Sequence, residues 1–202
     1  LTRLVKKGYK VAICEQVEDP KLAKGMVKRE VTRVVTPGTT LNAQALDETK
    51  NNYIMCIAYI GDHYGISSAD ITTGDYYVTE VDSERKLLDE VNKYQPTEII
   101  CNEAFYISGI DIDDMKNRMG IVIYSLDAWY FSDETAQMTL KDHFKVRDLE
   151  GLGLADYDSG VVAAGALLKY LYETQKTTLS NLVAIHPYTT GKFMIIDSST
   201  RR

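Results

Sequence analysis

Three β-rich runs, separated by short glycine-containing turns, occupy the middle of the chain and constrain its fold more than any other feature. The first two, Tyr53–Ile60 and Tyr64–Ile71, flank a turn at Gly61, and the third, Tyr76–Val81, follows a turn at Gly74. Turns this short join antiparallel neighbours, because a parallel pair needs a crossover of a dozen or more residues. The sequence therefore predicts an antiparallel three-stranded meander.

Helical and strand patterns alternate after this meander. Ser83 or Asp82 can cap a helix that stops before Pro96. Small residues in the last long helix predict a close approach to a sheet. The order of elements predicts an α/β fold: a ribonuclease H-like mixed five-stranded sheet flanked by helices, with a partial α/β segment before it. The predicted later strands are Glu98–Cys101 and Ile121–Ser125, and the predicted later helices are Ile112–Met119, Asp133–Phe144 and Val161–Thr174.

The first 40 residues are predicted to form a part of the molecule separate from the meander. Lys10–Gln16 predicts a short buried strand, and Val27–Val35 alternates like a second strand. Alternation places Arg29 and Arg33 on one face, about 13 Å apart at about 3.3 Å per residue. Thr36–Thr39, with the sequence TPGT, predicts a tight turn, in which proline fixes its own φ and glycine permits a positive φ.

Any attraction to nucleic acid has to come from this first piece. Residues 1–40 carry nine Lys or Arg against four Asp or Glu, whereas residues 41–202 carry 14 against 25. An acidic surface repels phosphate, so the second part is excluded as an electrostatic DNA site. The candidate DNA-backbone contacts are Lys24, Lys28, Arg29 and Arg33, and a solvated surface is the alternative for each of them.

Apolar residues make up 45% of the chain and prolines number only four, which excludes a disordered class. Cys14, Cys56 and Cys101 lie far apart in apolar runs, so we expect small buried side chains in a reducing cytoplasm, with no disulfide framework and no metal pair. Apolar runs fall short of the roughly 20 residues that span a bilayer, so no membrane partner is expected. Both ends of the chain fall inside expected elements: a helix that ends before Gly8, and a helix that starts after an expected strand at Lys192–Ile196. This pattern predicts a piece of a longer protein.

Five segments together resemble one family, the bacterial MutS DNA mismatch-recognition proteins. They are Gly8–Pro20, Lys24–Thr39, Ser67–Tyr76, Tyr157–Leu182 and Met194–Arg202. The resemblance implies four parts in this order: the end of the mismatch-binding domain in residues 1–40, a linker in 41–50, the connector domain in 51–180, and the start of the core, or lever, domain in 181–202.

The resemblance also implies a function. A connector of this family passes conformational signals between the mismatch-binding and ATPase parts and offers a docking face to MutL. The candidates for that face are Gln137, Thr139 and Lys141 on the predicted helix Asp133–Phe144. The longer protein is expected to bind mismatched DNA, ATP and Mg²⁺ and to form a homodimer. This chain is expected to be non-catalytic and without a cofactor, because it lacks the spacing of a P-loop. No metal site is expected in it either.

Two other classes of function compete with this interpretation. A metal-dependent nuclease of the same fold needs several carboxylates that converge on two metal ions. The first predicted strand has no acid, and Asp70 stands alone near the end of the second, where a turn role is expected. His63, His143 and His186 are too scattered to indicate a metal site. An acidic α/β interaction module is the third interpretation.

Overall fold

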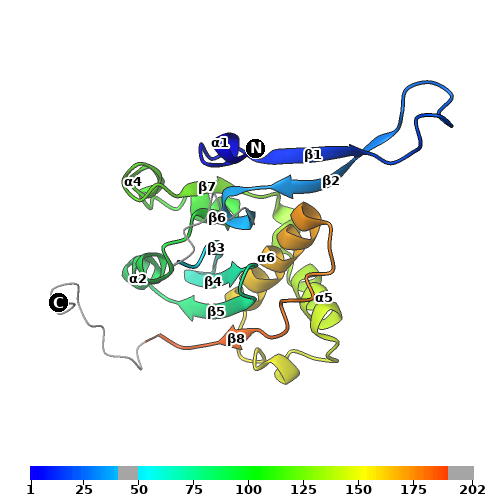
Figure 1. Cartoon of the computed structure of the whole chain (residues 1–202). Helices are drawn as coiled ribbons and strands as arrows, with labels where there is room; N and C mark the ends of the chain where they lie inside the picture. The colour runs from blue at the N-terminus through cyan, green and yellow to red at the C-terminus, as the bar shows by residue number, and fades with distance from the viewer. Residues whose placement is uncertain (41–49, 191–202) are drawn as a thin grey trace.

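The structure is a computed structural model that describes residues 1–40 and 50–190. The predicted linker falls outside these residues except for Lys50. The predicted strand at Lys192–Ile196 and the helix start expected after it also lie outside them. Within the described residues the chain forms a two-stranded hairpin at the N-terminus and a larger sheet covered by helices (Figure 1).

The strands and helices follow one another in an order close to the predicted one. The strands are β1 Val11–Gln16, β2 Arg29–Val35, β3 Ile54–Ile60, β4 His63–Asp70, β5 Asp75–Val81, β6 Glu98–Cys101, β7 Val122–Ser125 and β8 His186–Pro187. The helices are α1 Thr2–Val5, α2 Glu84–Tyr94, α3 Glu103–Tyr106, α4 Ile112–Arg118, α5 Asp133–Phe144 and α6 Ser159–Gln175. Three 3₁₀ turns complete the set: η1 Pro37–Thr39, η2 Ala128–Phe131 and η3 Glu150–Leu152.

The larger sheet is mixed, with the order β7-β6-β3-β4-β5-β8. The predicted meander is confirmed, because β3, β4 and β5 pair antiparallel. Strands β6 and β7 extend the sheet in parallel from β3. The prediction of five strands is wrong by one, because His186–Pro187 pairs with β5 as a sixth strand. A two-residue strand that contains proline has no alternating pattern from which it could be recognised.

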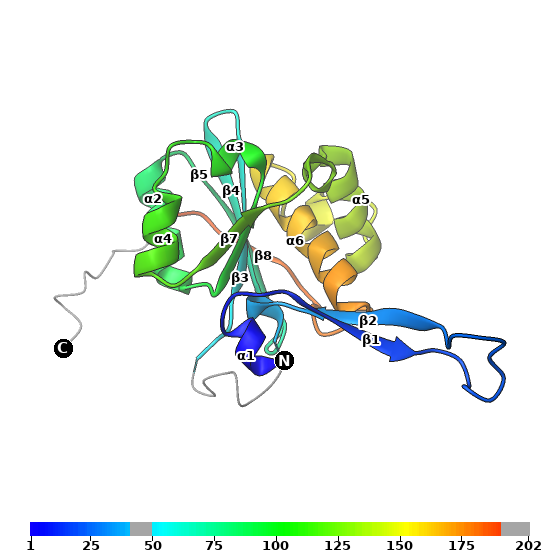
Figure 2. The ribbon, with the colours of Figure 1, turned by 90° about the horizontal axis from the view of Figure 1, so that it is seen from above.

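Each face of this sheet packs against its own layer of helices (Figure 2). Alternate residues of the strands point to opposite faces, so Met55 and Ile57 join one core and Cys56 and Ala58 join the other. Helices α2, α3 and α4 close the first core, and α5 and α6 close the second. The central strands are consequently buried on both sides, which explains their nearly continuous apolar sequence.

Two glycines fix how α6 packs. The small residues of α6 predicted an approach to the sheet, but Gly165 faces α5, where a Cβ would lie 2.4 Å from the Cα of Ala136. The tight contact with the sheet comes from Gly65 in β4, where a Cβ would lie 1.9 Å from the carbonyl oxygen of Ser159. The prediction therefore named the right helix. Gly160 of α6 also meets the sheet, where a Cβ would lie 3.1 Å from Cγ2 of Val78, but the tightest approach is at Gly65 in the strand.

Strands β1 and β2 form an antiparallel hairpin that projects from the body (Figure 1). The prediction that β1 is buried is wrong, and Cys14 is exposed, because no second layer covers this hairpin. The prediction that Arg29 and Arg33 share a face is also wrong. They pair with Gln16 and Ile13, three positions apart on β1, because the register shifts by one residue between them. An odd separation places the two arginines on opposite faces.

Candidate functional site: the joint between the hairpin and the sheet

The Thr36–Thr39 turn lies directly against the first residue of β6. The hydroxyl of Thr36 donates to Oε2 of Glu98 at 2.6 Å, and the backbone N–H of Gly38 donates to the same oxygen at 2.8 Å. A Cβ at Gly38 would lie 2.8 Å from Cβ of Ile54. Gly38 does not have the positive φ that the sequence suggested. Glycine is needed here because the backbone approaches the sheet so closely.

The other carboxylate oxygen of Glu98 faces two tyrosines of the sheet domain. The hydroxyl of Tyr170 on α6 donates to Oε1 at 2.8 Å, and the hydroxyl of Tyr124 on β7 donates to the same oxygen. The ammonium group of Lys10 lies 3.6 Å from the centre of the Tyr124 ring. Glu98 is fully buried. Burial raises the pKa of its carboxyl group, and the donors and Lys10 offset part of that rise.

A second set of contacts joins the same two parts. Nε of Arg33 donates to the side-chain oxygen of Gln175 at 3.0 Å, and one of its terminal nitrogens donates to the carbonyl of Thr39 at 2.7 Å. The side-chain amide of Asn52 donates to the carbonyl of Pro37 at 3.1 Å. We call the Glu98 cluster and these contacts the joint. Polar side chains form it, and each donor meets an acceptor on the other part or in the turn itself.

The four candidate DNA contacts fall into two places. Lys24, Lys28 and Arg29 lie at the far end of the hairpin and are exposed. Lys28 forms an exposed ion pair with Glu30 at 2.6 Å. Arg33 lies at the base of the hairpin, half-buried in the joint. The structure therefore leaves three of the four residues exposed toward the far end of the hairpin and gives the fourth structural partners.

The sequence did not single out the residues at the centre of the joint: Lys10, Glu98, Tyr124 and Tyr170. One signal was present, because Glu98 opens an otherwise apolar strand. A charged residue in a strand that is buried on both faces needs a partner. The partners come from four segments of the chain, so the spacing of residues could not reveal them.

The candidate docking residues on α5 do not share one face. Gln137 and Lys141 are one helical turn apart and line the same shallow hollow, with the exposed Met138 between them. Gln137 donates to a carboxylate oxygen of Asp133 at 2.7 Å. Thr139 does not line this hollow, and its hydroxyl donates to the carbonyl of Thr135 at 2.8 Å.

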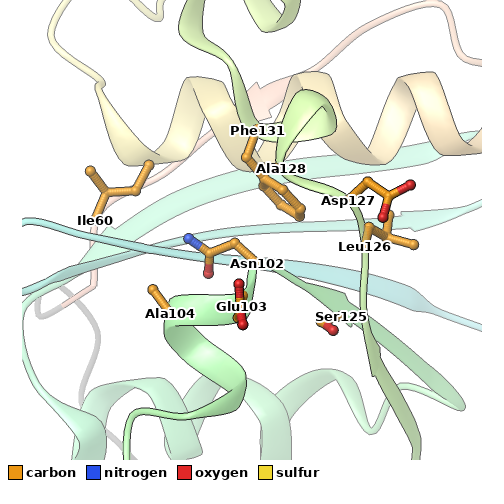
Figure 3. Close-up of a pocket in the computed structure, with 9 residues that line it drawn as sticks. All are labelled: Ile60, Asn102, Glu103, Ala104, Ser125, Leu126, Asp127, Ala128 and Phe131. Atoms are coloured by element: carbon orange, nitrogen blue, oxygen red, sulfur yellow. The ribbon is translucent and has the colours of Figure 1, made fainter.

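A pocket of about 480 Å³ opens at the carboxyl ends of β3, β6 and β7 (Figure 3). The chain leaves β6 toward one face of the sheet and leaves β7 toward the other, and such a switch point is a common ligand position in α/β sheets. In this pocket the side chain of Asn102 already has hydrogen-bond partners. It accepts from the backbone N–H of Tyr59 at 3.0 Å and donates to the carbonyl of the same residue at 2.9 Å. Its role is to hold the end of β3.

The acids do not gather as metal chemistry needs. Asp70 accepts hydrogen bonds from the backbone of Asn52 at 3.0 Å and from the backbone and hydroxyl of Thr72 at 2.9 and 2.6 Å. In residues 1–40 and 50–190, no three His, Cys, Asp or Glu side chains come together as a set that could hold a metal ion. The carboxyl group of Asp70 thus closes the turn between β4 and β5.

Comparison with known families assigns both parts of the molecule. Residues 52–183 match the family described as MutS domain II, and residues 1–44 match MutS domain I. The chain belongs to the MutS family of DNA mismatch repair proteins. The joint described above therefore lies between MutS domain I and MutS domain II.

Curated MutS proteins match over the whole chain. The chain is 61% identical to the DNA mismatch repair protein MutS of Lachnoclostridium phytofermentans over 202 residues, which is 22% of that protein. It is 45% identical to MutS of Ruminiclostridium cellulolyticum and 39% identical to MutS of Protochlamydia amoebophila, of which it covers 23% and 24%. The chain spans about a quarter of the length of these relatives or slightly less. Among its described helices, none has the length and apolar character needed to cross a bilayer.

Proposed function

We propose that residues 51–180 act as the connector of a MutS protein and carry conformational changes between the mismatch-binding part and an ATPase part of the longer chain. The observation that supports this most strongly is the joint, where domain I and domain II share a buried carboxylate and its four donors. A contact made of matched polar groups fixes one relative orientation, because a displaced donor would lose its acceptor. A movement of one domain therefore breaks or shifts hydrogen bonds that the other domain makes.

We also propose a ribonuclease H-like connector. Three antiparallel strands followed by two strands that add in parallel beside the first support this assignment. In this proposal the fold serves as a scaffold without chemistry of its own. The chain holds no cofactor, and binding of mismatched DNA, ATP and Mg²⁺ belongs to the whole homodimeric protein in the cytoplasm.

The test of the connector uses the full-length protein. Residues 36–39 are replaced by Gly-Ala-Gly-Ala, which removes the hydroxyl groups of Thr36 and Thr39, and the Gly151→Ala variant serves as the control. We expect mismatched DNA to bind as before and basal ATP hydrolysis to persist, while the change in ATPase rate on adding mismatched DNA is lost. An unchanged response of the ATPase to mismatched DNA would rule out signalling through the joint.

We further propose that the α5 hollow, with Gln137 and Lys141 at its centre, docks MutL, and that Thr139 supports the helix. Lys141→Glu reverses the charge at this face, and Lys116→Glu makes the same change on α4, across the sheet. Binding of full-length protein to MutL on mismatched DNA is measured by surface plasmon resonance. We expect Lys141→Glu to weaken binding about tenfold and Lys116→Glu to leave it unchanged. Equal binding by both variants would contradict this docking face.

A further inference from the structure

Glu98 has all of its acceptor capacity used, and each of its two oxygens serves a different part of the molecule. Oε2 accepts from Thr36 and Gly38 of the N-terminal part, and Oε1 accepts from Tyr124 and Tyr170 of the sheet domain. An ionised carboxylate accepts about four hydrogen bonds and donates none. A protonated or amide side chain of the same shape would turn one of these acceptors into a donor. The arrangement is therefore specific for a carboxylate.

The charge that faces Glu98 also comes from the N-terminal part. Lys10 lies over the ring of Tyr124 at 3.6 Å and near that of Tyr170 at 5.5 Å. Burial lowers the pKa of Lys10 and raises the pKa of Glu98, and the attraction between the two charges offsets part of each shift. The titratable groups of the cluster are thus Lys10 from before β1, Glu98 from β6, Tyr124 from β7 and Tyr170 from α6. These four groups come from four separate segments of the chain.

Few apolar side chains of the hairpin strands are buried. Both of its strands are mostly exposed, and in β1 and β2 only Val35 is buried. Gly38 lets the backbone of the turn reach the carboxylate, since a methyl group there would lie 3.0 Å from Oε2. Polar contacts are directional, whereas apolar contacts tolerate sliding. The orientation of the hairpin therefore depends on the joint.

We propose that Glu98 is a latch: its ionised carboxylate holds the first 40 residues of this chain in one orientation on the sheet domain. Releasing the latch leaves the sheet domain folded and lets the hairpin, which is only marginally stable by itself, sample other orientations. The link from latch to signal transmission rests on the proposed connector function, but the latch itself is defined within these 202 residues. It can be tested without DNA, ATP or MutL.

The experiment measures a distance across the joint by double electron–electron resonance. Cys14 is exposed on the hairpin, whereas Cys56 and Cys101 are buried, so a spin label attaches to Cys14 without removing a native cysteine. Asp89→Cys places the second label on the exposed side of α2. We compare this doubly labelled chain with the same chain carrying Glu98→Gln. The width of the distance distribution is expected to at least double in the Glu98→Gln chain.

Glu80→Gln is the matched control. Glu80 also accepts two hydrogen bonds on one oxygen, from the backbone N–H groups of Asp158 and Gly160 at 2.6 and 2.9 Å. Its partners lie within the sheet domain, so the same chemical change there is expected to leave the distribution narrow. Equal widths in the Glu98→Gln chain and the unmodified chain would overturn the latch, as would equal broadening by Glu80→Gln.

Lys10→Met keeps the proposal testable if Glu98→Gln fails to fold. This change removes the positive charge beside the latch and keeps a long apolar stem over Tyr124. We expect a smaller broadening, about 1.5-fold, with an unchanged circular dichroism spectrum. No broadening in this variant overturns the latch. If the distribution broadens but ATPase coupling in the full-length protein survives, the latch stands and the proposed connector function fails.

Discussion

The strands of the hairpin and the strands of the sheet domain are held in place by different kinds of contact. In the sheet domain two apolar layers cover both faces, and the inward residues of β3 are completely buried. In the hairpin the side chains near the tip are open to solvent, with Leu22 and Met26 exposed by 80% and 99%. A two-stranded hairpin alone is only marginally stable in water. The hairpin must therefore take its position from the joint.

This contrast shows where each part is sensitive to substitution. Apolar layers are intolerant of added volume, because protein interiors are packed to the density of organic crystals. A polar joint is intolerant of lost or reversed hydrogen bonds, because each unmatched buried group costs free energy. We expect changes in the sheet domain to unfold it, and changes in the joint to free the hairpin while the sheet stays folded.

Gly65→Ala is expected to have the largest effect. The added methyl group would lie 1.9 Å from the carbonyl oxygen of Ser159, so α6 must move away from β4. We expect the free energy of unfolding to fall by about 4 kcal/mol, as for severe overpacking. Gly151→Ala is the control, since its Cβ would meet ordinary contacts of 3.6 Å. Urea denaturation followed by circular dichroism measures the free energy of unfolding of both variants. Equal stability of the two variants would contradict the role of Gly65.

Gly38→Ala is expected to act on the hairpin alone. A Cβ there would lie 2.8 Å from Cβ of Ile54, so the turn must lift from the sheet and release Glu98. Hydrogen exchange followed by mass spectrometry should show protection lost in residues 11–35, equivalent to about 2–3 kcal/mol. Protection in β3, β4 and β5 should persist. Loss of protection across the whole sheet would show that the two parts unfold together.

The sequence predicted the sheet domain well because its signals are local. Short turns fixed the meander, and β-rich runs marked the strands that face helices on both sides. The cap of α2 was equally readable, because the predicted Ser83 accepts a side-chain hydrogen bond from the backbone N–H of Lys86. The sequence did not predict strand β8, because a strand of two residues is too short to show an alternating pattern.

The joint could not be predicted in the same way. The TPGT sequence indicated a turn, but its tight contact with Ile54 and Glu98 depends on how two distant segments meet. The shift of register between β1 and β2 also could not be recognised from the sequence. It places Arg29 and Arg33 on opposite faces of the hairpin, where the sequence predicted one face. Local patterns specify elements, whereas the polar contacts between parts are specified by tertiary structure.

Alkaline pH should weaken the sheet domain through a buried thiol. Burial raises the pKa of Cys101 to about 12 from an ordinary value of 9.0. A raised pKa means that the folded state favours the neutral thiol, so its contribution to stability is complete below pH 9 and is lost as the pH rises toward 12. Between pH 9 and pH 10.5, the free energy of unfolding of the unmodified chain should fall by about 2 kcal/mol relative to that of the Cys101→Ala chain.

Urea denaturation of both proteins at several pH values measures this difference. The tyrosines that ionise in the same range are common to both chains, so their effect cancels when the two stabilities are subtracted. Cys14→Ala is the hairpin control, because its thiol is exposed. A difference between the unmodified chain and Cys101→Ala that stays constant from pH 9 to pH 10.5 would show that this thiol is not linked to folding.

The smallest expected effect concerns DNA, and it separates the two ends of the hairpin. Each phosphate contact releases counterions, so affinity for duplex DNA falls with salt by about 0.9 logarithmic units per contact. Replacing Lys24 and Lys28 by alanine should weaken the binding of this chain to DNA and reduce that salt slope by up to about 2. Arg33→Met should leave the slope nearly unchanged, because this guanidinium already donates to Gln175 and Thr39.

Fluorescence anisotropy at several salt concentrations measures the slope on matched and G·T-mismatched duplexes. We expect weak binding that does not distinguish the two duplexes, because contacts to phosphate carry no information about base pairing. A slope reduced more by Arg33→Met than by the double lysine change would move the DNA contact from the exposed tip to the joint. In that case DNA and the hydrogen bonds to Gln175 and Thr39 would compete for one arginine. DNA binding would then itself loosen the contact between hairpin and sheet.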